Sequence, residues 1–182
     1  CKACFTTASW GDYTKIIHTP LRHSDVIPFN TPLREVIRQL AVMKRSFFFL
    51  ADEGEVAGLI TVANLNCRQV SVFLFGLLVE LEVRMGHAVR AHYKDDLEAA
   101  IRTVCVGERA EDIFGRFESD RARGVDAPLI EYVYLSDLLR LLLKDGLYER
   151  FGYSRKDFKD RMGSLVDLRN QVAHPTRSLI DG

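Results

Sequence analysis

The pattern of apolar and polar positions changes near residue 68 of the chain. Before that point, short apolar runs surround one amphipathic segment, which is typical of strands and a helix. After it, apolar residues recur every three or four positions over most of the chain, which predicts helices. We therefore expect an α+β protein, with a small α/β module over residues 1–68 and an all-α helical bundle over residues 69–182.

The first part contains local signals for each element. Thr31 is a candidate helix cap and Pro32 suits the first helical position. The predicted elements are, in order, an extended segment at 25–28, a helix from Pro32, a buried strand at 47–50, a turn at 52–55, a return strand at 56–61 and a new helix start near Asn64.

The second part predicts five helices joined by short connections, as in a helical bundle. Their expected ranges are Ser71–His87, Lys94–Val106, Ala110–Arg123, Pro128–Lys144 and Ser154–Ala173. Ten of the fourteen residues from Val72 to Met85 are apolar, so we expect the first of these helices to be covered on several sides, by its own bundle or by a partner subunit. The apolar run within it is too short to span a bilayer.

Composition narrows the classes of function. The chain has 182 residues with 25 basic and 25 acidic side chains, so its formal net charge is zero. This balance argues against a binder that holds nucleic acid or a membrane surface by bulk charge alone. The four cysteines, Cys1, Cys4, Cys67 and Cys105, include a single CxxC pair. A structural zinc site wants a second pair, so we expect free thiols in a reducing cytoplasm and no metal site.

The strongest site signal lies at the end of the last predicted helix. Arg169 falls near the middle of the helix's apolar stripe, where solvation alone does not explain a guanidinium. Asn170 and His174 are four residues apart and would share a face. Arg169 and His174 are roughly 140° apart on an ideal helix, so they converge only if the Arg side chain reaches round or two helices meet.

This group combines an acid/base residue, a fixed cation and an amide, which suits RNA cleavage through an internal 2′-hydroxyl nucleophile. The structural alternative is that Arg169 pairs with an acid such as Glu80. His174 would then only complement the dipole at the C-terminal end of the helix.

The string Leu168-Arg169-Asn170-Gln171-Val172-Ala173-His174-Pro175-Thr176-Arg177 resembles the signature of the HEPN superfamily of helical-bundle domains. The resemblance covers about residues 70–180. Members of this family often have a Glu and an Arg on the first long helix, and Glu80 and Arg84 resemble that pair. Many members are metal-independent endoribonucleases that dimerise so that two such motifs meet. By this likeness Arg169 and His174 are catalytic, Asn170 supports them, and no cofactor is required.

The segment from Val26 to Leu65 resembles a CBS motif, in which a Gly-apolar-apolar-Thr/Ser-x-x-Asp ending binds adenine nucleotides. Here that ending is Gly58-Leu59-Ile60-Thr61-Val62-Ala63-Asn64. By likeness Thr61 would contact phosphate, whereas Asn64 in place of the Asp offers the ribose no charge-assisted acceptor. The structural alternative is that Thr61 or Asn64 caps the following helix. Because CBS motifs work in pairs, the likeness also favours a dimer.

Together these patterns predict a cytoplasmic, homodimeric, metal-independent endoribonuclease with RNA as its substrate and a CBS-like sensory or dimerisation module. The alternative is a non-catalytic regulator that senses an adenine nucleotide or binds a protein partner, such as an antitoxin, in a toxin–antitoxin or defence system. Neither prediction involves a membrane.

Overall fold

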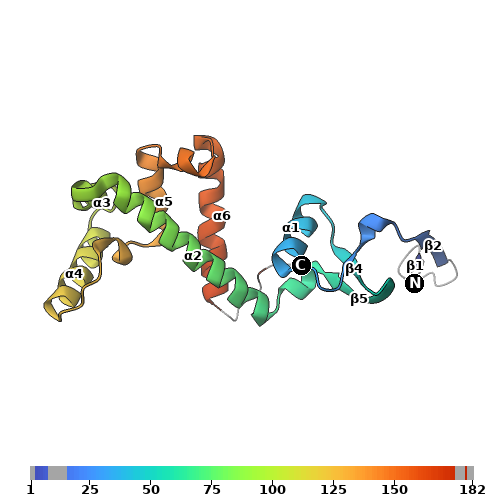
Figure 1. Ribbon diagram of the computed structural model, residues 1–182. Helices are drawn as coiled ribbons and strands as arrows, with labels where there is room; N and C mark the ends of the chain where they lie inside the picture. Colours follow the sequence, from blue (N-terminus) through green and yellow to red (C-terminus); the bar gives the residue numbers. More distant parts are fainter. Residues whose placement is uncertain (1–2, 8–15, 175–178, 180–182) are drawn as a thin grey trace. The chain divides into compact units, whose positions relative to one another are not determined.

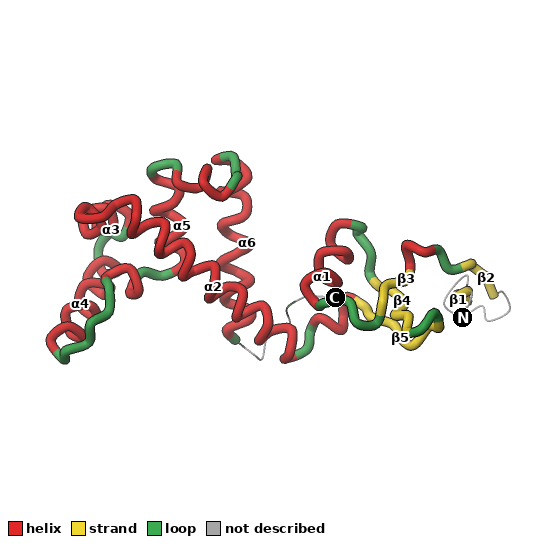
Figure 2. Tube along the Cα trace, in the orientation of Figure 1, coloured by secondary structure: helices red, strands yellow, loops and turns green. Residues whose placement is uncertain are grey.

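The computed structural model describes residues 3–7, 16–174 and 179, and it divides into two compact units between Cys67 and Arg68. The first unit contains the strands and the second is almost entirely helical (Figure 2). The α+β class predicted from the sequence is confirmed at this level. Cys1 and the Pro175–Arg177 part of the HEPN-like string lie outside the described residues.

The first unit is built on a three-stranded mixed sheet with the order β3-β4-β5. Strand β3 (Val26–Pro28) runs parallel to β4 (Phe47–Asp52), and β5 (Glu55–Thr61) runs antiparallel to β4. The crossover between the two parallel strands contains α1 (Leu33–Val42). The buried apolar residues of this unit are Ile27, Val36, Leu40, Phe48 and Leu65. A separate antiparallel pair is formed by β1 (Ala3–Thr7) and β2 (Ile16–Pro20).

The turn between β4 and β5 is a tight hairpin, as predicted. Glu53 and Gly54 both have positive φ, at 47° and 86°, which is the combination that matches the twist of the flanking strands. The predicted cap of α1 is wrong. The helix begins at Leu33 with Pro32 at its N-cap, and the Thr31 hydroxyl donates to the Pro28 carbonyl at 2.6 Å, so Thr31 does not cap the helix.

The second unit has five helices, in which α2 (Arg68–Tyr93), α5 (Leu135–Lys144) and α6 (Arg155–Ala173) pack against one another (Figure 1). Helix α3 (Leu97–Val104) packs on α5, and α4 (Glu108–Ala122) packs on the short 3₁₀ helix η4 (Leu129–Tyr132). A further 3₁₀ helix, η5 (Leu147–Phe151), connects α5 to α6. The last helix starts as predicted, because the Ser154 side chain accepts a hydrogen bond from the Asp157 N–H at 3.1 Å.

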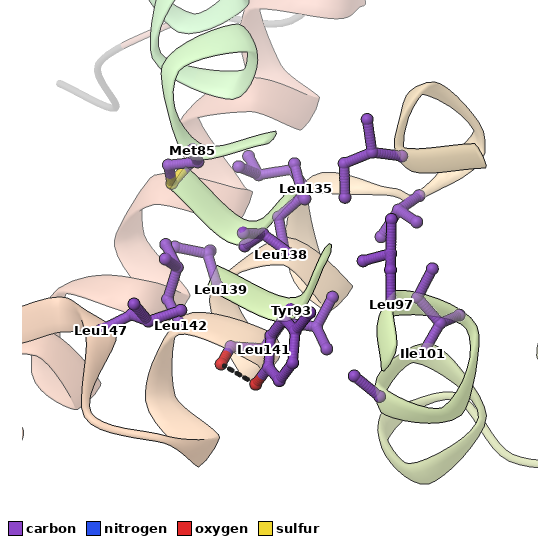
Figure 3. Packing of buried hydrophobic residues seen from close by; sticks show 14 of the residues in the cluster. Met85, Tyr93, Leu97, Ile101, Leu135, Leu138, Leu139, Leu141, Leu142 and Leu147 are labelled. Atoms are coloured by element: carbon purple, nitrogen blue, oxygen red, sulfur yellow. Dashed lines mark hydrogen bonds between the residues drawn. The ribbon is translucent and has the colours of Figure 1, made fainter. Parts of the chain in front are cut away.

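The core of the second unit lies where α2, α3 and α5 meet (Figure 3). Helix α5 contributes most, with its leucines turned inward, and Tyr93 reaches from the end of α2 to the end of α5. The Tyr93 hydroxyl donates to Asp145 at 2.6 Å, so its polar end is satisfied while its ring is buried. Burial and this hydrogen bond both raise the pKa of Tyr93.

Helix α2 is longer than expected and less covered. It runs six residues beyond the predicted end, to Tyr93. The Ile130 side chain packs against Gly86 of this helix. The bundle buries only one side of it, so four apolar residues stay exposed in a stripe, namely Val72, Phe75, Val79 and Val83. The expectation that its own bundle covers several sides is therefore wrong. Among the residues that the structure describes, no helix combines the length and apolar character needed to cross a bilayer.

Candidate functional site

Arg169 lies on the inner side of α6, as its place in the apolar stripe predicts. Phe158 and Val172 of that stripe are buried, and Met162 and Leu165 are partly buried against the core. The Arg169 side chain is 41% exposed, so its guanidinium reaches water at the margin of the packed face.

The nearest acid to Arg169 is Glu82 on α2. Arg169 Nε and Glu82 Oε1 are 3.9 Å apart, which is an ion pair without a hydrogen bond. Burial raises the pKa of Glu82, and the neighbouring Arg169 lowers it by a smaller amount. The two groups therefore form a long ion pair in which both side chains are partly exposed.

Glu80, the acid suggested as a partner for Arg169, binds elsewhere. Its carboxylate pairs with Arg84, four residues further along α2, with an Arg84 Nη2 to Glu80 Oε1 distance of 2.5 Å. Both side chains are more than half exposed. The Glu80–Arg84 pair thus forms as the spacing predicts, on the surface of α2 and apart from Arg169.

His174 lies just beyond the end of α6. The helix ends at Ala173, and His174 has extended backbone angles (φ −112°, ψ 91°) with an exposed side chain. Its N–H still donates to the Gln171 carbonyl at 3.2 Å. The face predicted to be shared with Asn170 therefore stays a prediction, since His174 is the cap residue of α6 and not part of its helical turns.

Within the described part of the chain, no hydrogen bond or ion pair joins Arg169, Asn170 and His174 to one another. Asn170 is half-buried on the last turn of α6, and His174 is exposed beside it. The three side chains are brought to one end of one helix.

Thr61 and Asn64 are held together at the end of β5. The Asn64 Oδ1 atom accepts from the Thr61 N–H at 2.7 Å and from the Thr61 hydroxyl at 2.8 Å. The first of these bonds belongs to a capping box at the start of the 3₁₀ helix η2 (Val62–Leu65). The alternative that these residues cap the following helix is therefore supported. Asn64 is exposed, and both of its bonds to Thr61 use its Oδ1 atom and not its amide nitrogen.

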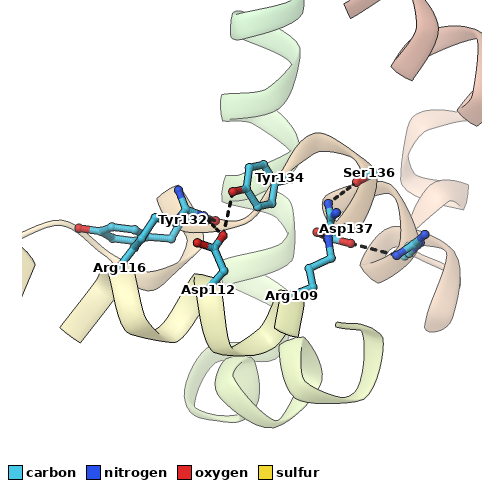
Figure 4. A network of polar contacts seen from close by, with 8 residues as sticks. Arg109, Asp112, Arg116, Tyr132, Tyr134, Ser136 and Asp137 are labelled. Atoms are coloured by element: carbon cyan, nitrogen blue, oxygen red, sulfur yellow. Dashed lines mark hydrogen bonds and ion pairs between the residues drawn. The ribbon is translucent and has the colours of Figure 1, made fainter. Parts of the chain in front are cut away.

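A second polar cluster, centred on Asp137, was missed by the sequence reasoning. Asp137 lies in the first turn of α5 and is fully buried. Its carboxylate accepts from Arg109 Nε at 2.5 Å and from Arg140 Nη1 at 3.2 Å, and Arg109 also donates to the Ser136 hydroxyl (Figure 4). A buried carboxylate held by two guanidiniums is a satisfied structural ion pair.

Cys105 lies against this cluster and is almost completely buried. Burial raises the pKa of its thiol to about 11, and the nearby Asp137 carboxylate adds to the increase. At neutral pH the sulfur is a protonated thiol, which is a poor nucleophile. The Asp137 cluster thus supports packing and offers no reactive cysteine.

The histidines of α2, His87 and His92, are exposed. Among the residues that the structure describes, no group of three or more His, Cys, Asp or Glu side chains is placed to hold a metal ion.

No protein-family model, curated protein or solved structure matches this chain. The HEPN-like and CBS-like resemblances therefore stay predictions, and the arguments for function rest on the residues themselves.

Proposed function

We propose that the helical unit is a metal-independent endoribonuclease that uses the end of α6. In this proposal Arg169 holds the phosphate at the cleavage point, Asn170 orients it, and His174 transfers the proton. The observation that carries the proposal is the loose pair between Arg169 and Glu82, at 3.9 Å. A half-exposed cation with an incomplete partner is available to an incoming phosphate.

The reaction needs no nucleophile from the protein. His174 accepts the proton of an RNA 2′-hydroxyl, and the freed oxygen attacks the adjacent phosphorus. The bond from phosphorus to the 5′-oxygen breaks, and that oxygen takes a proton from an imidazolium. The products are a 2′,3′-cyclic phosphate and a 5′-hydroxyl. Arg169 stabilises the extra negative charge on the phosphorus centre through its guanidinium.

We further propose that two copies pair through the exposed stripe of α2. Val72, Phe75, Val79 and Val83 are between 42% and 65% exposed and recur at helical spacing. A Cβ placed on Gly76 within the stripe would meet no atom within 4 Å, so a second helix can approach the backbone there. A dimer of this kind supplies a second His174. One histidine can then act as the general base and the other as the general acid.

The test is incubation of the full chain with structured and single-stranded RNA in EDTA. We expect cleavage with cyclic-phosphate ends, and a loss of about 10²-fold or more in His174→Ala. His92→Ala is the matched control, since His92 is an exposed histidine outside the site. Cleavage that survives His174→Ala, or no cleavage of any RNA by the wild type, would contradict the proposal.

The second candidate is a regulator that senses an adenine nucleotide through the first unit. It is favoured by the contact between Thr61 and Asn64, since the motif needs both at one strand end. The sharpest variant is Asn64→Asp, which keeps the oxygen acceptor of the box and adds the charge that a ribose prefers. Tighter ATP binding by Asn64→Asp, measured by calorimetry, would support a nucleotide site. No binding by either form would exclude it.

A further inference from the structure

An apolar cavity of about 310 Å³ lies between α2, α5 and α6. Its walls are long aliphatic side chains from all three helices, namely Leu81, Met85, Leu139, Leu142, Met162 and Leu165. Met85, Leu139 and Leu142 are labelled among the core residues of Figure 3. Cavities between the helices of a bundle, of this size and lining, are a common place for small-molecule binding.

The polar groups of the cavity come from one side. Arg161 lies at its margin, with its guanidinium carbon 5.3 Å from the ring centre of Tyr153. Ser164, on the same helix, adds a hydroxyl to the lining. Among the described residues, no acid lies within ion-pair distance of Arg161. An apolar cavity with an unpaired arginine at its margin suits an amphiphilic anion, in which an apolar chain ends in a negatively charged head group.

The margin is also apolar and exposed. Phe151 and Tyr153 line the cavity, and each is more than one third exposed. Aromatic rings at an opening cover a bound chain while their edges stay in water. Water itself is a poor occupant, because leucine and methionine walls give it almost no hydrogen-bond partners.

We propose that this cavity binds a single-chain aliphatic carboxylate, with the chain between α2, α5 and α6 and the carboxylate on Arg161. One guanidinium matches one carboxylate in charge and offers it two parallel N–H donors. The volume is about ten times the roughly 30 Å³ share of a water molecule, which suits a chain of about ten carbons. The ligand class is therefore a free medium-chain fatty acid. This site is independent of RNA cleavage by the end of α6.

The experiment is calorimetric titration of the full chain with decanoate below its micelle concentration and, in parallel, with uncharged 1-decanol. We expect one decanoate site per chain. Arg161→Gln should weaken decanoate by about tenfold, since it removes a charged hydrogen-bond donor, and should leave 1-decanol unchanged. Arg155→Gln is the matched control, because Arg155 lies on the same helix outside the cavity.

A second variant tests the chain-binding part. Leu165→Trp occupies part of the cavity and should weaken the binding of both ligands, and Met162→Phe should do so to a smaller extent. Thermal unfolding selects the variants that fold. No decanoate binding by the wild type, or equal binding by wild type and Arg161→Gln, overturns the proposal. It is also overturned if the wild type gives no heat and sediments as a dimer that Leu165→Trp dissociates, since a second copy then covers the cavity.

Discussion

The helical unit contains two arginine–carboxylate pairs between helices in which the arginines are equally exposed, at 40% and 41%, but the carboxylates differ in burial and distance. In the first, Asp137 is fully buried and accepts from Arg109 at 2.5 Å. In the second, Glu82 is about one third exposed and lies 3.9 Å from Arg169. The first carboxylate has a second arginine, Arg140, on its other oxygen, whereas the second has none among the described residues.

The difference separates a pair that maintains the fold from a pair that leaves a cation available. A buried carboxylate must be compensated completely, and removing its partners leaves an unpaired charge in the interior. A half-exposed pair at long distance contributes little to stability, because water solvates both groups. Its guanidinium can exchange one anion for another at low cost. The loose pair, and not the tight one, is where we expect function.

The largest effect should follow removal of the buried carboxylate. Asp137→Ala removes the acceptor of two charge-assisted hydrogen bonds, from Arg109 and Arg140, and we expect a loss of about 3 kcal/mol in the free energy of unfolding. Thermal unfolding should show the midpoint lowered by roughly 10 °C.

The matched control is Asp126→Ala, in which an exposed aspartate is removed from the loop before η4. Its midpoint should stay at the wild-type value. If Asp137→Ala melts like this control, the buried cluster does not stabilise the fold and the contrast between the two pairs disappears.

A smaller stability effect, with a large effect on activity, is expected for Arg169→Gln. The free energy of unfolding should change by less than about 1 kcal/mol, because the pair with Glu82 is half-exposed. RNA cleavage should fall by about 10²-fold, since a donor to the developing charge is lost. The two measurements are urea unfolding and single-turnover cleavage. Destabilisation as large as that of Asp137→Ala would assign Arg169 to the fold instead.

The pH dependence of stability should reveal Glu82. Burial raises its pKa, so the folded protein keeps this proton at pH values where the unfolded chain has released it. This contribution to stability is complete below the ordinary glutamate pKa and is lost as pH rises through the raised value. Glu82→Gln should remove that part of the slope in urea titrations between pH 4 and 7. An unchanged slope would show that Glu82 titrates normally.

The smallest effect is expected for the exposed pair on α2. Arg84→Gln removes an ion pair four residues apart in which both side chains are more than half exposed. We expect a loss of no more than about 0.5 kcal/mol, and less in high salt because exposed charges are screened. A loss above 2 kcal/mol, or a loss that salt does not reduce, would mean that this pair is buried in an assembly.

Local structure could be predicted from the sequence wherever a few neighbouring residues determine it. The start of α6 at Ser154, the hairpin turn at Gly54 and the pairing of Glu80 with Arg84 were all predicted. The place of Arg169 on the packed side of α6 was also predicted, because a helical wheel needs only the spacing of the apolar residues.

Tertiary contacts decided what was missed. An aspartate in the first turn of a helix is usually exposed, so nothing local indicated that Arg109 and Arg140 would bury Asp137. The predicted helix at 128–144 is interrupted at Val133 and Tyr134, which are extended. Arg116 donates to the Tyr132 carbonyl at 3.0 Å and satisfies a group that a continuous helix would have paired internally.

The site was predictable as a set of residues but not as a geometry. The string from Leu168 to His174 identified the side chains, yet the partner of Arg169 proved to be Glu82. Which acid of α2 faces α6 depends on how two helices pack. The end of α6 at Ala173, by contrast, was predicted, and His174 follows it directly.

The short connection between α2 and α3 limits where the chain tolerates inserted residues. Lys94 ends α2 with a left-handed φ of 46° and a one-turn 3₁₀ helix leads directly into Leu97, so there is no loop to absorb an extra residue. One added residue would rotate α3 by about 100° and turn Leu97 and Ile101 away from the core. The exposed stretch at 123–126 is a loop between α4 and η4, so an added residue beyond Gly124, which has a left-handed φ of 79°, need not rotate a core helix. Insertions should therefore accumulate there and be absent at Lys94.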